Sequence, residues 1–136
     1  MTASAKYMLD TTICIYIQRQ NSPAVLSRFE KLKPGQAVIS VITWGELLFG
    51  AAKSNKAKAV HGLLSEFVSL IPVEPMSPRC GKVYGQIRFE LGKRGLPVVN
   101  NDLWIAAHAQ ALGLILITNN TREFERISGL KLENWS

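Results

Sequence analysis

The sequence predicts an α/β protein, with a short, mainly parallel central sheet between two layers of helices in an α/β/α arrangement. Short, continuous apolar runs recur along the chain beside turn residues, as in strands that are buried on both faces. Longer segments with apolar residues at helical spacing separate these runs. The length of 136 residues fits one sheet, so we expect a single domain over residues 1–136.

Regular structure is expected to begin with a strand and a helix. Residues 6–9 form a short apolar run that predicts a strand, and Asp10 closes it. Thr11 and Thr12 can cap a helix over residues 13–18, because hydroxyl oxygens accept hydrogen bonds from the free amides at a helix start. The first aspartate of the chain is therefore expected at a strand end.

A second helix and a second strand follow. Pro23 is typical of a helix start, and apolar residues as far as Phe29 fall on one face of that helix. The turn residues at 33–36 separate it from a buried strand at residues 37–39, which ends near Ser40.

The middle of the chain predicts two helices and a strand. Apolar spacing indicates a helix from about residue 41 to residue 52 and, after a lysine-rich break, another over residues 58–67. The apolar run at residues 70–73 predicts a third strand. Pro75 and Pro78 bracket the turn that follows.

The last part of the chain alternates helices with strands. A long helix is expected over residues 79–93 and stops at Gly95. Residues 96–101 form a loop, and a helix over residues 102–112 ends at Gly113, a residue type that readily follows a helix end. The remaining strand, short helix and last strand are expected at residues 114–117, 124–127 and 130–132.

The charge of the chain bears on its partners. Sixteen Lys and Arg residues against ten Asp and Glu give a net charge of +6. A polyanion such as RNA would bind such a surface, and a solvated surface with excess lysine explains the same count, so both interpretations stay open. No run approaches the ~18 apolar residues of a membrane span, and the N-terminus lacks the order of a signal peptide, which predicts a cytoplasmic protein without a membrane partner. Cys14 and Cys80 form no CxxC pair and are interpreted as small buried side chains.

Three carboxylates stand out in this basic chain. Asp10 and Asp102 are its only aspartates, and Glu46 interrupts an apolar helix. In parallel sheets, ligands bind at the carboxyl ends of the strands, where Asp10, Ser40 and Asn120 are expected. Carboxylates brought together there would resist ionising unless a divalent cation joined them, and Mg²⁺ or Mn²⁺ prefers such oxygen ligands.

Each carboxylate also has a purely structural explanation. Asp10 could cap a strand end, Glu46 could occupy the exposed side of an amphipathic helix, and Asp102 could be a helix N-cap. His108 follows Asp102 by six residues, or about 240° around a helix, and is expected to point away as a packed or surface residue. His61 has no Ser or Cys pair beside it, so a hydrolase triad lacks support.

Four segments together resemble PIN-domain ribonucleases, with the VapC toxins of bacterial type II toxin–antitoxin pairs as the nearest match. These segments share acidic or amide residues at strand and helix ends, and they are residues 7–11, 40–47, 101–109 and 116–124. The resemblance covers nearly the whole chain. It implies a three-layer α/β/α fold and a Mg²⁺-dependent endoribonuclease, with Mn²⁺ as a substitute ion.

The resemblance also implies substrates, partners and roles. VapC toxins similar to this chain cleave structured RNA, and the enteric branch cuts initiator tRNA in its anticodon loop. They are typically homodimers that a VapB antitoxin inhibits in a hetero-oligomer. Carried over by position, Asp10 and Asp102 would be the main metal ligands, and Glu46 would bind the metal or orient its water. Asn120 stands where many PIN domains place a fourth acidic residue.

Three residues depart from the family pattern. Thr12 replaces an Asn that could orient Asp10, so the geometry around that carboxylate could be looser. Val99 replaces a Gly, and because a β-branched residue disfavours positive φ, the replacement could shift Asp102. Asn120 lacks a full negative charge.

Two other classes of function remain as alternatives. One is a non-catalytic RNA-binding protein, although the scattered positions of Trp44, Trp104 and Trp135 disfavour a stacking surface. The other is a regulatory module that only binds a protein partner. PIN-like nucleases that act on flap or single-stranded DNA are a narrower alternative, and the short chain favours RNA.

Overall fold

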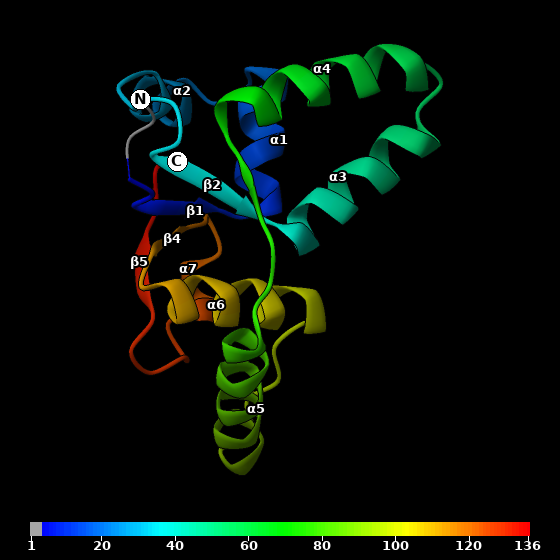
Figure 1. The fold of residues 1–136 in the computed structure, drawn as a ribbon. Helices are drawn as coiled ribbons and strands as arrows, with labels where there is room; N and C mark the ends of the chain where they lie inside the picture. The colour runs from blue at the N-terminus through cyan, green and yellow to red at the C-terminus, as the bar shows by residue number, and fades with distance from the viewer. Residues whose placement is uncertain (1–3) are drawn as a thin grey trace.

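The computed structural model describes residues 4–136 and places a parallel sheet at the centre of the chain (Figure 1). In the described residues the sheet has five strands in the order β3-β2-β1-β4-β5, and every neighbouring pair is parallel. The expected parallel α/β sheet is thereby confirmed. The strands are short and are β1 (Tyr7–Leu9), β2 (Ala37–Ser40), β3 (Val73–Glu74), β4 (Ile115–Ile117) and β5 (Lys131–Glu133).

Helices cover both faces of the sheet and give the expected three layers (Figure 1). One face carries α1 (Thr11–Arg19), α2 (Pro23–Glu30), α3 (Val41–Lys53) and α4 (Ala57–Leu70). The other carries α5 (Pro78–Lys93), α6 (Asn100–Leu112) and α7 (Thr121–Phe124).

Side chains on a strand alternate between two separate cores, because successive residues of a strand point to opposite faces. Leu9 packs in the core under α1 to α4, whereas its neighbour Met8 packs in the core under α5 to α7. Ile39 and Val38 divide in the same way, and all four are at most 2 % exposed. The sheet is therefore buried on both sides, which explains why its strands are continuously apolar.

The strand order changes direction beside β1. The chain moves outward from β1 to β2 and β3, and it then returns to place β4 on the other side of β1. Such a switch point opens a crevice at the carboxyl ends of the two strands, which is where parallel sheets bind ligands. Asp10 follows β1 directly, and its amide donates a hydrogen bond to the carbonyl oxygen of Ile117 at the end of β4 (3.0 Å).

The start of α1 corrects one expectation. Asp10, not Thr11 or Thr12, is the N-cap, since its Oδ1 accepts a hydrogen bond from the amide of Ile13 (2.9 Å). The helix accordingly begins at Thr11, two residues earlier than expected. A carboxylate is a strong N-cap ligand, and the extended backbone of Asp10 fits that position.

Further boundaries differ from the sequence prediction, and the short helix expected at residues 124–127 is α7 at Thr121–Phe124. The apolar run at residues 70–73 is mostly not a strand, because α4 continues to Leu70 and β3 covers only Val73–Glu74. Pro72 lacks an amide hydrogen and can only accept a ladder bond, here from Ile39 (3.0 Å). Helix α6 begins at Asn100, so residues 100–101 belong to a helix and not to the expected loop. Among residues 4–136, no helix has both the length and the apolar character needed to cross a membrane.

Candidate functional site

Asp10 lies at the centre of the candidate site and is only 6 % exposed. Burial raises the pKa of its carboxyl above 3.8, and the nearby carboxylate of Glu46 acts in the same direction. The side chain of Thr118 and the amides of Ile13 and Thr12 lower the pKa and so favour the ionised form. The carboxylate is thus held by fixed donors at the edge of the sheet, with acceptor capacity left over.

Glu46 reaches the same region from α3 on the first face of the sheet. It is half-buried, and its Oε1 accepts a hydrogen bond from the hydroxyl of Thr11 (2.6 Å). Thr43 Oγ1 lies within hydrogen-bond distance of the same hydroxyl (3.3 Å). The Thr11 bond joins the first residue of α1 to α3, so the residue after Asp10 also orients Glu46.

Asp102 approaches from α6 on the opposite face of the sheet. It is the third residue of the helix, so it is not the N-cap; that position belongs to Val99, which has no capping side-chain bond. Burial, followed by the carboxylates of Glu123, Asp10 and Glu46, raises the pKa of Asp102 to about 6. Three other carboxylates therefore lie close enough to Asp102 to disfavour its ionised form.

Glu123 is a site residue that the sequence interpretation missed. Its Oε2 accepts a hydrogen bond from Asn120 Nδ2 (2.5 Å), and its Oε1 accepts one from the amide of Val99 (3.2 Å). It is also the charged neighbour with the largest effect on the pKa of Asp102. Asn120 itself is exposed and acts here through Glu123. The sequence did contain one sign of this role, since Glu123 is a carboxylate three residues after Asn120 in a short helix.

The departures from the family pattern do not strain this geometry. Val99 has φ −56°, which a β-branched residue adopts freely, so no positive φ is required there. Thr12 is exposed at the surface, and its backbone amide rather than its side chain contributes to the environment of Asp10. The amide of Ile13 supplies the orientation that an Asn at position 12 was expected to give.

The side chains match the oxygen donors that a hard divalent ion prefers. Asp10, Glu46, Asp102 and Glu123 all contribute carboxylates, and three of them raise the pKa of Asp102. Within residues 4–136, no group of three or more His, Cys, Asp or Glu residues is close enough together to hold an ion directly. The site thus offers a group of mutually repelling carboxylates that are coupled electrostatically but separated.

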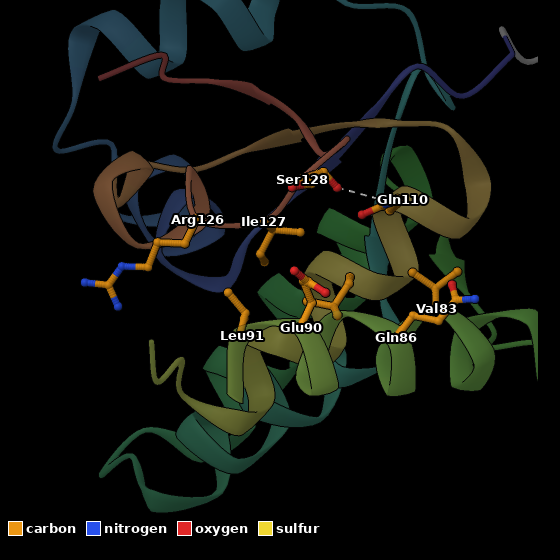
Figure 2. Close-up of a pocket in the computed structure, with 9 residues that line it drawn as sticks. Val83, Gln86, Glu90, Leu91, Gln110, Arg126, Ile127 and Ser128 are labelled. Carbon is orange, nitrogen blue, oxygen red and sulfur yellow. Dashed lines mark hydrogen bonds between the residues drawn. The ribbon is translucent and has the colours of Figure 1, made fainter. Parts of the chain in front are cut away.

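Two cavities flank the fold away from the centre of this group. One, of about 280 Å³, runs between α1, α3 and α4 and includes Glu46 in its wall. The other, of about 230 Å³, lies between α5, α6 and residues 126–128 (Figure 2). Its lining includes Glu90 and Gln110 but none of the four site carboxylates, whereas Glu46 lines the first cavity.

Comparison with known proteins identifies relatives of nearly the same length. The family model for the PIN domain matches residues 7–130. The chain is 44% identical over 131 residues to a tRNA(fMet)-specific endonuclease VapC of Shigella flexneri, covering 96% of this chain and 98% of that protein. It is 42% identical over 130 residues to ribonuclease VapC2 of Haemophilus influenzae, again covering 96% of this chain and 98% of the relative.

Solved structures agree with the sequence relatives. The DNA-bound VapBC structure of Salmonella typhimurium matches with a TM-score of 0.91 and 38% identity, over 97% of this chain and 99% of the matched chain. VapBC2 of Rickettsia felis, bound to a DNA fragment from its promoter, matches with a TM-score of 0.88 and 39% identity, over 96% and 98% of the two chains.

Proposed function

The chain belongs to the PIN-domain family, among its VapC ribonucleases, and from that premise we propose that it is a Mg²⁺-dependent endoribonuclease toxin that cuts tRNA. The expected family and the expected nuclease class are confirmed by these relatives. The observation that carries the proposal is the coupling of Asp10, Glu46 and Glu123 to Asp102 at the carboxyl ends of β1 and β4. The Shigella flexneri relative, a tRNA(fMet)-specific endonuclease, supports initiator tRNA as the substrate.

PIN-domain nucleases generally depend on a divalent metal ion, and we assign Mg²⁺, with Mn²⁺ as a substitute. Mg²⁺ keeps several water molecules and needs only one or two carboxylates from the protein. That preference suits carboxylates too far apart for three to ligate one ion directly. We therefore assign Asp10 and Asp102 as the metal ligands and let Glu46 act through a bound water.

The chemistry follows from the placement of the side chains. Bound Mg²⁺ would supply charge neutralisation at the scissile phosphate and a lowered pKa for water. Asp10, after β1, and Asp102, on α6, would hold the ion. Glu46, oriented by Thr11, accepts a hydrogen bond from the attacking water and aligns it with the phosphorus. Glu123 and Asn120 stabilise the Val99 end of α6 and thereby position Asp102.

The RNA is held by exposed cations and not by an aromatic surface. Arg88 and Lys93 of α5 are exposed and can contact phosphates, which positions RNA without reading its sequence. The tryptophans are engaged within the protein: Trp104 stacks on Tyr84 with ring centroids 3.7 Å apart, and Trp135 is buried. The exposed Phe49 and Phe89 lie on separate helices, α3 and α5, and form no shared stacking surface. This engagement favours the nuclease over a non-catalytic RNA-binding module, which would need free stacking faces.

The proposed partner is a VapB-type antitoxin, since the matched structures from Salmonella typhimurium and Rickettsia felis are VapBC complexes. The cavity between α1, α3 and α4 would receive an antitoxin segment, because it combines apolar walls with Glu46 at its edge. A positively charged side chain there would compete with the metal. A homodimer and a bacterial cytoplasmic location, where tRNA is available, complete the proposal.

Incubating the purified chain with tRNA tests the proposal. Wild-type protein should produce fragments with 5′-phosphate and 3′-hydroxyl ends in Mg²⁺ and none in EDTA. The matched control is Asp102→Asn, which keeps the size of the side chain but removes its charge and should not cut. Fragments that persist in EDTA or carry cyclic phosphates would reject the metal-dependent mechanism. A mobility shift without fragments would favour the RNA-binding alternative.

A further inference from the structure

His108 is a fully buried histidine that the proposed chemistry does not use. It lies on α6 with 0 % of its surface exposed. Its Nδ1 is 2.9 Å from Ser40 Oγ, which is also completely buried. Its Nε2 is buried without a hydrogen-bond partner. Burying a polar nitrogen without a hydrogen-bond partner is costly, so the contact at Nδ1 is the main polar interaction of the ring.

The neighbours of His108 determine which nitrogen carries the proton. Ser40 Oγ already accepts a hydrogen bond from the amide of Ile42 (3.1 Å), so its own proton is free to be donated to Nδ1. The proton of the neutral ring then lies on Nε2, and the backbone of Pro75 acts on the pKa of the ring in the direction that favours a proton. Burial lowers the pKa of His108, which keeps the ring neutral.

The histidine therefore bonds to the start of α3 and lies near the ends of β2 and β3. Ser40 is the last residue of β2 and the N-cap of α3, the helix that carries Glu46. Pro75 follows the end of β3 directly. His108 itself belongs to α6, whose first turn carries Asp102. The two helices lie on opposite faces of the sheet, so the bond between His108 and Ser40 joins the two faces at the carboxyl end of β2.

We propose that His108 is a positioning residue, which accepts a hydrogen bond from Ser40 at Nδ1 and thereby fixes α6 against the start of α3. It sets the separation of Asp102 from Glu46 without touching the RNA or the metal. This inference rests on the proposed function for its consequence in metal binding, but the hydrogen-bonded arrangement itself does not.

Divalent-ion binding by the purified chain is the first test. Mn²⁺ is titrated into wild-type protein and into His108→Leu, which keeps bulk but cannot accept a hydrogen bond. Partners that orient metal ligands typically change metal affinity by about tenfold to a hundredfold, and we expect a loss in that range. His108→Asn retains an acceptor near the Nδ1 position and should recover most of the affinity. His61→Leu, at an exposed histidine of α4, is the matched control and should leave affinity unchanged.

A second variant removes the other partner of the same hydrogen bond, Ser40. Ser40→Ala removes the donor but also an N-cap bond, and Ser22→Ala removes the corresponding N-cap bond of α2 alone. Only Ser40→Ala should weaken Mn²⁺ binding, and it should lower kcat for tRNA with little change in KM. Wild-type affinity in both His108→Leu and Ser40→Ala would overturn the proposal. If His108→Leu does not fold, wild-type affinity in Ser40→Ala alone overturns it.

The nuclear magnetic resonance spectrum of the imidazole needs neither metal nor RNA. A bare Nδ1 and a protonated Nε2 support the arrangement, whereas a proton on Nδ1 overturns it. Failure of wild-type protein to bind Mn²⁺ or cut RNA would reject the proposed function. In that case the imidazole spectrum would still decide the position of the proton.

Discussion

The two faces of the sheet supply different parts of the candidate site. The face under α1 to α4 contributes Glu46, which a single hydroxyl from Thr11 orients. The face under α5 to α7 contributes Asp102 and Glu123, which interact mainly through charge. Asp10 stands between them at the end of β1. Because each layer brings its own carboxylate, the spacing of the layers determines the geometry of the site.

The largest expected effects come from the two aspartates. Asp10→Asn and Asp102→Asn should each lower tRNA cleavage by more than about a thousandfold, because each removes the charge of a proposed ligand to the ion that would stabilise the transition state. Cleavage assays in Mg²⁺ check this, with thermal unfolding as the control for folding. Retained activity in either variant would remove that residue from the site.

Asp10 also caps a helix, which is a structural role that Asp102 does not have. Asp10→Ala should destabilise the fold by about 0.5–2 kcal/mol through loss of the α1 cap, whereas Asp10→Asn keeps a capping oxygen. Asp102 caps nothing, so Asp102→Ala should cost no cap and should relieve carboxylate repulsion. Chemical denaturation of the three variants measures the difference. Equal stability of Asp10→Ala and Asp10→Asn would contradict the capping argument.

Substitution of Glu123 is expected to lower cleavage less than substitution of either aspartate, but more than substitution of a neighbouring residue. Glu123→Gln should lower cleavage by about tenfold to a hundredfold, since it weakens the support of α6 at Val99 and changes the charge beside Asp102. Glu125→Gln changes an exposed carboxylate two residues away and serves as the matched control. Similar activities for both variants would show that Glu123 is outside the site.

The free energy of unfolding should depend on pH through Asp102, which lies on the face under α5 to α7. Its pKa rises from 3.8 to about 6 on folding, so between these values the metal-free folded chain holds a proton that the unfolded chain has released. The free energy of unfolding should therefore fall as pH rises through this window, and Asp102→Asn should remove that part of the fall. Below about pH 6, protons should compete with Mg²⁺ and weaken its binding. Denaturation without metal across this range checks the sign, and a slope identical in both proteins would refute it.

The smallest expected effect concerns the Thr11 bond on the first face. Thr11→Val removes the hydroxyl that donates to Glu46, and water can replace it in part, so we expect a loss of less than about tenfold in kcat. Thr12→Val changes an exposed hydroxyl next to it and should have no effect on kcat. Steady-state kinetics of the two variants measure this difference in kcat. Equal losses in Thr11→Val and Thr12→Val would mean that the Thr11 hydroxyl has no special role.

The sequence predicted the architecture well because its signals are local. Apolar runs of three or four residues predicted the strands at Tyr7–Leu9 and Ile115–Ile117, since buried parallel strands need no alternation. The strand at residues 70–73 was misplaced because the apolar run continues from a helix through a buried turn at Ile71. An apolar run alone does not distinguish a buried helix end from a strand.

The candidate site was predicted only in part because its contacts are distant in sequence. Asp10, Glu46 and Asp102 were recognisable as carboxylates at predicted element ends. The role of Glu123 depends on a contact with Val99 across 24 residues, which no local pattern reports. The capping role of Asp10 was assigned to Thr11 and Thr12, since Asp and Thr both favour that position. His108 was expected to be a packed or surface residue and is buried, yet its bond to Ser40 spans 68 residues.

The pairing of β1 with β4 has a consequence for the synthesis of the chain. Tyr7 pairs with Ile115, and Glu123 lies beyond β4, so the carboxylate group needs both the first and the last segments of the polypeptide. A nascent chain on the ribosome has Asp10 and Glu46 long before it has the remaining two. Fragments that end before residue 102 should therefore lack nuclease activity, because they carry only Asp10 and Glu46 of the four carboxylates.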